Sequence, residues 1–311
     1  MNLLPSNNEN LYGYKELFLE FKQLYDKNLL PNKIIFCGSN GIGKSTFVYH
    51  LINYIFSLNE SNRYNFEDNI ISKNNYSYNL ILKNSHPNFF SILKDEKKET
   101  GQISKIREMI NFTNKSSFNN QHKIILIDNV ENLNVYSINA LLKLIEDPNN
   151  KIYFFIIHNS RKKILETFSS RCIKFNFFLN NNNKIEIINK LVNDNFYLNL
   201  NIDFKNFYNT PGDILSLYNF FKQNDIDNSI SIDELLKLII NKYLFKNNLY
   251  IQGNLPYLIE LFFYKKISYY SPKQKIYLLY KYFLSKMSDY NKYNLDLESI
   301  LIEFNGKLLS D

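Results

Sequence analysis

The sequence has few cysteines and no long apolar run, and each shortage excludes a class of protein. Its 311 residues include only 2 cysteines, Cys37 and Cys172. This number excludes a disulfide framework and a four-cysteine zinc module, so we expect no zinc and two buried, reduced thiols. No apolar run is long enough to span a bilayer, and residues 1–9 are polar, without the pattern of a signal peptide. We therefore expect a cytoplasmic protein with no membrane partner.

The charge and the aromatic content identify no partner by themselves. The 37 basic residues exceed the 30 acidic residues by 7, which is compatible with a nucleic-acid surface but does not establish one. The 24 Tyr and 26 Phe have AT-rich codons, as do the abundant Asn, Lys and Ile, so genome composition accounts for them. Hydrophobic residues make up 45% of the chain, which is enough for two or three domains with cores of their own.

The first half of the chain alternates short apolar runs with helical stretches, which predicts a parallel α/β sheet. Residues 33–37, 122–127 and 151–158 are predicted strands, and their near-continuous apolar character indicates that helices cover both faces. Residues 44–56 are predicted to form a helix, because their apolar residues recur every three or four positions. The polar residues 57–79 are predicted to form an irregular insertion.

The second half of the chain is predicted to be helical. The four asparagines at 180–183 predict a linker. Beyond them, Ser231 with Glu234 fits a capping box, and Ser271 before Pro272 fits a second helix start. We therefore expect an α/β domain over residues 1–178, a small helical domain over 179–225 and a C-terminal helical domain over 226–311.

Residues 38–45 match the Walker A pattern and lie between a predicted strand and a predicted helix. The glycines allow the backbone to wrap closely around phosphates, and the helix N-terminus supplies N–H donors. Lys44 is predicted to contact the β- and γ-phosphates, and Ser45 to hold Mg²⁺ through its hydroxyl group. The alternative, a glycine-rich turn without a ligand, is disfavoured by this strand–loop–helix context. The predicted phosphate-binding residues are Gly38, Gly41, Ile42, Gly43, Lys44, Ser45 and Thr46.

Asp128 ends the second predicted strand and resembles a Walker B aspartate that reaches Mg²⁺. An ordinary helix cap at the strand end is the alternative. Fast hydrolysis usually also needs an adjacent carboxylate to orient water, but Asn129 occupies that position. The sequence therefore predicts a phosphate cradle with weak or no ATPase activity.

Three motifs after Asp128 resemble those of AAA+ clamp-loader subunits. They are Asn-Ala-Leu-Leu-Lys at 139–143, Glu-Asp-Pro at 146–148 and Ser-Arg-Cys at 170–172. His86-Pro87 and residues 103–107 are most similar to the delta-prime branch of bacterial DNA polymerase III. The resemblance is specific from Tyr12 to Phe178, and beyond that it rests on the helical pattern alone.

The resemblance implies an α/β AAA+ P-loop domain with a parallel sheet, a helical lid and an all-α collar. It implies ATP or ADP with Mg²⁺ as cofactor. The expected partners are gamma/tau and delta subunits in a hetero-pentamer, which opens a sliding clamp and places it on primer-template DNA. Arg171 matches the arginine finger that acts in the ATP site of the neighbouring subunit, where a planar cation stabilises charge on the transferred phosphoryl group. The alternative for Arg171 is an ion pair on its own surface.

The chain also departs from the family pattern. The sensor-1 position falls at His158-Asn159, and Asn159 is predicted to bind a γ-phosphate. Residues 210–214, at the sensor-2 position, have no arginine, and Asp213 there would repel phosphate. These departures, with Asn129, favour the delta-prime branch, which has weak or absent ATPase activity.

Several alternatives stay open at this point. The chain is either delta-prime-like or a gamma/tau motor with an unusual Walker B motif. An unrelated P-loop enzyme, such as a small-molecule kinase, and a DNA-binding regulator are less consistent with the motifs. Lys105 and Arg107 lie either in the central channel of a ring or on a solvated helix face. The sequence does not decide whether this subunit contacts DNA directly.

Overall fold

The computed structural model describes residues 4–93, 99–146, 151–192, 195–205, 209–269, 273–293 and 296–309. It divides into two compact units, residues 1–187 with 210–212, and residues 188–209 with 213–311. The division into three domains stays a prediction. The predicted helix start at Ser271 and Pro272, and the pair Asp147-Pro148, lie outside the described residues.

In the described part of the first unit, five parallel strands form one sheet in the order β2-β3-β4-β1-β5. The three predicted strands are confirmed as β1, β3 and β4, whereas β2 and β5 were not predicted. The strands are β1 Lys33–Gly38, β2 Phe89–Ile92, β3 Lys123–Ile127, β4 Ile152–Asn159 and β5 Ile173–Asn176.

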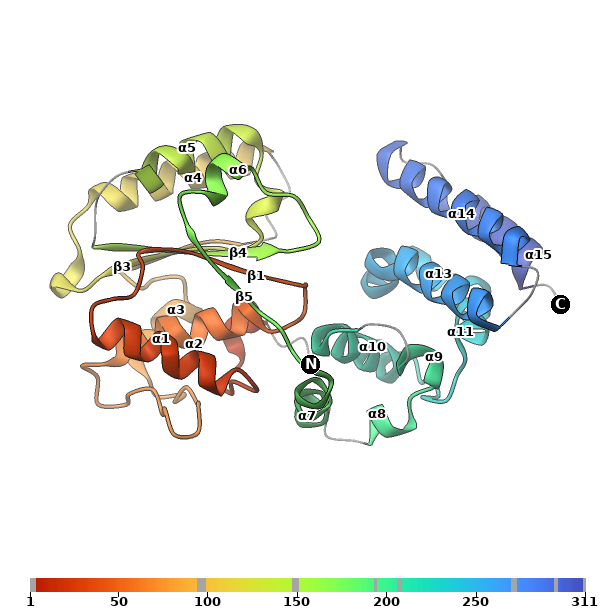
Figure 1. Ribbon diagram of the computed structural model, residues 1–311, viewed down its shortest axis with the longest axis horizontal. Coiled ribbons are helices and arrows are strands. Elements are labelled where there is room, and N and C mark those ends of the chain that lie inside the picture. The colour runs from red at the N-terminus through yellow and green to blue at the C-terminus, as the bar shows by residue number, and fades with distance from the viewer. Residues whose placement is uncertain are drawn as a thin grey trace. The chain divides into compact units, whose positions relative to one another are not determined.

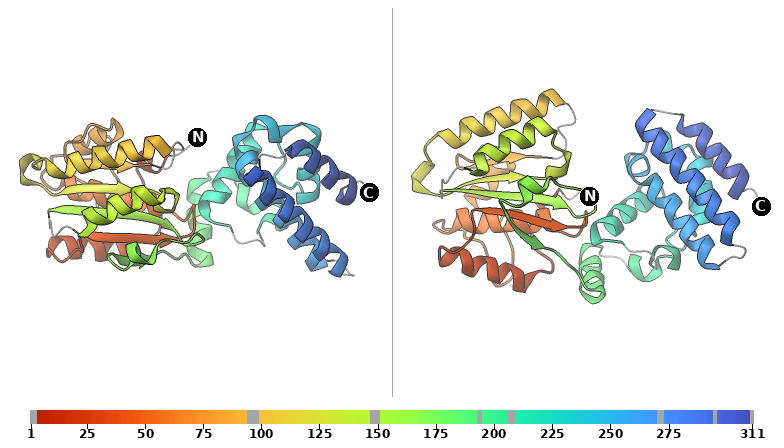
Figure 2. Two further views of the ribbon diagram at one scale, coloured as in Figure 1. Left: turned by 90° about the horizontal axis from the view of Figure 1, so that it is seen from above. Right: turned by 45° about the horizontal axis from the view of Figure 1, so that its top comes forward.

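Helices cover both faces of this sheet, as Figures 1 and 2 show. Alternate strand residues point to opposite faces. Ile34 and Phe36 therefore share one core with α1, α2 and α3, and Ile35 and Cys37 share another with α4, α5 and α6. The helices are α1 Lys15–Asp26, α2 Lys44–Ser57, α3 Tyr76–Leu82, α4 Glu99–Asn114, α5 Val135–Glu146 and α6 Glu166–Ser169, with short 3-10 turns η1 Pro5–Asn7, η2 Phe118–Asn120 and η3 Val130–Asn132.

The predicted irregular insertion ends earlier than expected. Residues 76–79 belong to α3, because the Asn75 side chain accepts a hydrogen bond from the Tyr78 N–H and caps the helix. The irregular part is held by Glu60, whose carboxylate accepts from the Asn75 side chain and from the Ser77 hydroxyl at 2.5 Å. Side-chain hydrogen bonds thus replace regular backbone pairing in this segment.

The linker predicted at residues 180–183 was wrong. Asn181–Leu191 form helix α7, whose first turn contains three of the four asparagines. The reason is that the Asn180 side chain accepts a hydrogen bond from the Asn183 N–H at 2.7 Å. Asparagine favours this N-cap position as strongly as it favours a turn, so a run of asparagines does not by itself predict a linker.

His50 of α2 is fully buried and joins two segments of the first unit. Its Nε2 donates to the Asn8 carbonyl oxygen at 3.0 Å, and its Nδ1 accepts from the Tyr64 hydroxyl at 2.9 Å. Because a carbonyl oxygen can only accept, Nε2 carries a hydrogen, and the neutral ring then accepts at Nδ1. Burial lowers the pKa of His50 from 6.5 to about 4.

The stability of the first unit is therefore expected to fall in mild acid. Unfolded His50 gains a proton near pH 6.5, whereas folded His50 gains one only near pH 4, so the stabilisation present above pH 6.5 is lost as the pH falls between these values. The loss between pH 6.5 and about 5 is roughly 2 kcal/mol, because one pH unit corresponds to about 1.4 kcal/mol.

Thermal unfolding of the full chain, followed by circular dichroism across this pH range, tests the prediction. His50→Gln should make the melting temperature less dependent on pH. His122→Gln, at a half-buried histidine whose pKa burial also lowers, should reduce the pH dependence less than His50→Gln does. An equal pH dependence in His50→Gln and wild type would contradict this role.

The described residues of the second unit form helices and connecting turns around one continuous core, which extends from Ile188 to Leu309. The capping box of Ser231 and Glu234 is confirmed at the start of α11. Lys265 pairs with Asp203 at 2.8 Å and with Asp233 at 2.6 Å, which ties α9, α11 and α13 together. The helices that follow α7 are α8 Phe196–Asn199, α9 Ile202–Lys205, α10 Pro211–Gln223, α11 Ile232–Asn241, α12 Leu244–Asn247, α13 Leu249–Tyr269, α14 Lys273–Tyr293 and α15 Leu297–Leu308. Among the described residues, no helix combines the length and apolar character needed to cross a membrane.

Candidate nucleotide-binding site

The predicted phosphate loop connects the end of β1 to the start of α2. Gly41 and Gly43 have φ values of 74° and 100°, a left-handed backbone that glycine adopts without steric cost. The hydroxyl group of Tyr14, which is not part of the loop, donates to the Ile42 carbonyl oxygen at 2.9 Å and stabilises the loop conformation. The loop therefore has the tight path that brings several backbone N–H groups to the N-terminus of α2.

Lys44, the first residue of α2, is buried and lies against its own loop. Its Nζ donates to the carbonyl oxygens of Gly38 at 2.8 Å and Ser39 at 2.7 Å. Burial lowers the pKa of Lys44 to about 8, and the negative charges of Asp128 and Glu131 partly offset this effect. A phosphate group would offer the ammonium stronger, charge-assisted hydrogen bonds than these carbonyl groups do.

Asp128 and Ser45 lie together, as the sequence predicts for a magnesium site. The Ser45 hydroxyl donates toward the Asp128 carboxylate at 3.4 Å, and the Asp128 N–H donates to Ile92 O at the end of β2. Hydroxyl and carboxylate oxygens are suitable ligands for Mg²⁺, so this donor set fits an ion that a nucleotide would bring. These two residues would hold the ion, and the ion would neutralise phosphate charge.

Asn129, next to Asp128, has the left-handed backbone conformation, with φ 58° and ψ 59°. Asparagine tolerates this conformation better than glutamate does. Its side-chain Nδ2 donates to Asp128 Oδ1 at 2.8 Å and thereby orients the carboxylate. Asn129 is therefore placed to support Asp128 rather than to activate water.

Asn159 ends β4 directly beside the phosphate loop, because it is the register partner of Gly38. The Ser160 N–H donates to the Gly38 carbonyl oxygen at 3.1 Å, which ties the end of β4 to the start of the loop. The Asn159 Oδ1 accepts from the Arg161 N–H at 3.1 Å. The carboxamide NH₂ is the end that can donate to a phosphate oxygen.

Glu131 was missed by the sequence analysis. It lies in η3, and its side chain is 1% exposed. Its Oε2 accepts from the Asn159 N–H and lies 3.3 Å from the His158 Nδ1. The sequence signal that could have identified Glu131 is its charge, because it is the charged residue of the turn that follows Asp128.

Gly212, in the segment predicted to lack the sensor-2 arginine, contacts the phosphate loop within the first unit. Its N–H donates to the Gly41 carbonyl oxygen at 2.9 Å. A Cβ atom at position 212 would lie 2.7 Å from the Gly41 Cα, closer than such contacts allow. Only glycine fits this backbone-to-backbone approach, so an arginine at 212 would require the segment to move.

Arg171 lies in the turn between α6 and β5, which is an edge strand of the sheet. Its Nε donates to Glu146 Oε1 at 2.7 Å, and its Nη1 donates to the Thr167 carbonyl oxygen at 2.6 Å. The ion pair is exposed, with 41% of the Arg171 side chain accessible. The alternative predicted for Arg171, pairing with an acid of its own surface, thus occurs in this chain, through Glu146 of the Glu-Asp-Pro motif.

The two cysteines are free thiols in the first unit. Cys37 is buried as predicted, whereas Cys172 is only half-buried, because it lies in the turn after Arg171. Burial raises the pKa of both thiols, that of Cys172 to about 11. Both thiols are therefore protonated and poorly reactive near neutral pH.

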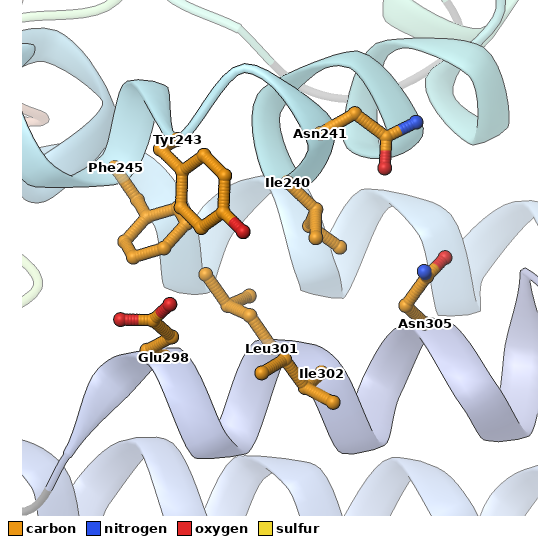
Figure 3. A pocket seen from close by; sticks show the side chains of 8 residues that line it. All are labelled: Ile240, Asn241, Tyr243, Phe245, Glu298, Leu301, Ile302 and Asn305. Carbon is orange, nitrogen blue, oxygen red and sulfur yellow. The ribbon is translucent and has the colours of Figure 1, made fainter.

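A separate cavity of about 410 Å³ lies in the second unit, between α11, α12 and α15 (Figure 3). Its volume is within the range of ligand pockets. Among its 8 lining residues the charged one is Glu298, which pairs with Lys246 at 2.7 Å. None of the predicted site residues lines it, and we assign no ligand to it.

The first unit has the architecture of an AAA+ P-loop protein. The strand order is β5-β1-β4-β3-β2, the phosphate loop follows β1, and an aspartate follows β3. The family described as "DNA polymerase III, delta subunit" matches residues 13–181, more than half of the chain. The chain belongs to this family.

Individual relatives support this assignment over part of their length. The DNA polymerase III subunit delta′ of Buchnera aphidicola subsp. Schizaphis graminum is 27% identical over 195 residues, which are 60% of this chain and 57% of that protein. The delta′ subunit of Buchnera aphidicola subsp. Baizongia pistaciae is 38% identical over 84 residues, 26% of this chain and 25% of that protein. The match thus spans 57% of the first of these relatives and 25% of the second.

One solved structure is that of a DNA polymerase III gamma subunit-related protein from Thermotoga maritima. Its superposition covers 94% of this chain and 92% of the Thermotoga chain. The two chains are 11% identical, with a TM-score of 0.42. At these values the likeness adds nothing to the assignment.

Proposed function

We propose that this chain is a delta-prime-like subunit of a DNA polymerase III clamp loader, which places a sliding clamp on primer-template DNA. The family match and the relatives named subunit delta′ support this role. The partners would be gamma/tau and delta subunits in a hetero-pentamer. The C-terminal helices, within residues 226–311, would supply the collar that holds the ring together.

The proposal that this chain binds nucleotide but hydrolyses it slowly rests on one observation, an intact phosphate loop together with Asn129 after the Walker B aspartate. Lys44, Ser45 and Asp128 would bind ATP or ADP with Mg²⁺. The Lys44 ammonium group lies within the loop and the Ser45 hydroxyl lies 3.4 Å from the Asp128 carboxylate, which supports this proposal. A carboxylate that could orient water is missing at position 129, and the left-handed backbone there suits asparagine. The chain would therefore retain a nucleotide and turn it over slowly.

The same chain would contribute Arg171 to the ATP site of a neighbouring subunit. The guanidinium is exposed at the edge of the sheet, and its bonds to Glu146 and Thr167 fix its direction. A pre-oriented planar cation loses less entropy when it binds a phosphoryl group. The gamma/tau alternative would require this chain to be a motor itself, which Asn129 disfavours.

A reconstitution experiment tests the proposed function. Clamp, primed circular DNA, delta, gamma/tau and this chain are mixed with ATP, and the clamp retained on DNA is measured. Loading should depend on this chain and should be lost when it is omitted. The control is the complete mixture without ATP. Loading at the full rate without this chain would contradict the proposal.

A further inference from the structure

Glu131 is a buried carboxylate for which the proposed nucleotide chemistry has no role so far. Its side chain is 1% exposed, and that of its partner His158 is 7% exposed. A carboxylate removed from water is costly unless hydrogen bonds replace its hydration. Because Glu131 lies in η3, three residues after Asp128, the contacts that it makes next to the nucleotide site indicate its role.

The partners of Glu131 are at the end of β4, across from its own turn. Oε2 accepts from the Asn159 N–H at 3.3 Å and lies 3.3 Å from His158 Nδ1. The same carboxylate oxygen is therefore within hydrogen-bond distance of the Asn159 N–H and of the His158 ring. Glu131 thus connects the turn after Asp128 to the backbone of Asn159.

Asn159 in turn lies beside the phosphate loop, through its register with Gly38 and the bond from Ser160. The carbonyl end of its side chain is engaged with the Arg161 N–H. The backbone and the side chain of Asn159 are thus both held, by Glu131 and by the following turn. This arrangement fixes the direction of the carboxamide NH₂ before a ligand arrives.

We propose that Glu131 is a positioning residue, which holds Asn159 so that the site distinguishes a nucleoside triphosphate from a diphosphate. The inference rests on the proposed function, since it requires that the P-loop bind nucleotide. Glu131 acts through the hydrogen bonds that its oxygen accepts, and so a neutral acceptor of the same shape serves as well. Asn159 contacts the γ-phosphate, which only the triphosphate has.

The test is the affinity of the full chain for ADP and for a non-hydrolysable ATP analogue, both with Mg²⁺. Wild type should bind the analogue more tightly than ADP, by about tenfold, as expected for one hydrogen bond to a charged group. Glu131→Ala and Asn159→Ala should each remove this preference for the analogue over ADP. The double variant should lose no more than Asn159→Ala alone, because both changes remove one interaction.

Conservative variants separate positioning from a merely structural role. Glu131→Gln keeps an acceptor oxygen and should retain the preference, whereas Glu131→Asp is too short to reach Asn159 and should lose it. Glu131→Asp also decides the matter if the alanine variant does not fold. The matched control is Glu20→Gln, on the exposed surface of α1.

Different failures identify which proposal is wrong. A wild-type chain that binds neither nucleotide would contradict the proposed function. A chain that binds both nucleotides equally, or whose preference is unchanged in Glu131→Ala and Glu131→Asp, would overturn the inference alone. Equal losses of ADP and analogue binding in these variants would also overturn it, since they would show that Glu131 only supports the fold.

Discussion

Replacing Arg171 by alanine is expected to lower ATP turnover at the neighbouring site of a reconstituted clamp loader by about 10³-fold. The guanidinium stabilises charge that develops on the transferred phosphoryl group, and no other group replaces it once it is removed. Arg171→Lys should recover little of this loss, because a single ammonium nitrogen cannot replace the planar pair of nitrogen donors of a guanidinium group. DNA-stimulated phosphate release by the assembled ring is the measurement.

The variant should assemble normally. The Arg171–Glu146 pair is exposed, and such pairs contribute about 1 kcal/mol or less to stability. Gel filtration of the ring checks assembly, and Arg63→Ala removes another exposed positive charge of the first unit as a control. If turnover in an intact ring were unchanged, Arg171 would be only a partner of Glu146 on its own surface.

Replacing Lys44 by alanine is expected to weaken nucleotide binding to the isolated chain by about 100-fold. The ammonium would donate to the β- and γ-phosphates, and hydrogen bonds to charged groups contribute about 1.5 to 3 kcal/mol each. Titration with a fluorescent, non-hydrolysable ATP analogue and Mg²⁺ measures the change.

Two further variants control for the buried position of Lys44. Lys44→Met fills the same space without the charge and should bind nucleotide as weakly as Lys44→Ala does. Lys27→Ala removes an exposed lysine from the end of α1 and should leave binding unchanged. Binding by Lys44→Met at the wild-type level would show that the loop does not use its lysine for phosphate.

The sequence was sufficient for the parts of the fold that local patterns determine. The buried strands β1, β3 and β4 are continuous apolar runs because helices cover both faces of the sheet. The phosphate loop was predictable because its glycines, its lysine and the flanking elements are contiguous in the chain. Strands β2 and β5 have four residues each, which is too short for a distinct pattern.

The features that could not be predicted depend on contacts between distant segments or on side-chain direction. Glu131 is ordinary in sequence, and its role depends on contacting Asn159 at the end of the adjacent strand β4. Gly212 matters only because the backbone of Gly41 lies 2.7 Å from the place of its missing Cβ. The run at 180–183 was misread because asparagine is suited both to turns and to the N-cap that Asn180 forms.

The central claim is that this subunit binds a nucleotide without being a motor and serves the site of its neighbour. The most direct test is ATP turnover by the reconstituted loader when only this subunit has Lys44→Ala and the ring is intact. The account predicts turnover unchanged from the unmodified loader, in contrast to the loss expected for Arg171→Ala. A fall in turnover equal to the loss of one motor site would contradict it, because this chain would then hydrolyse ATP itself.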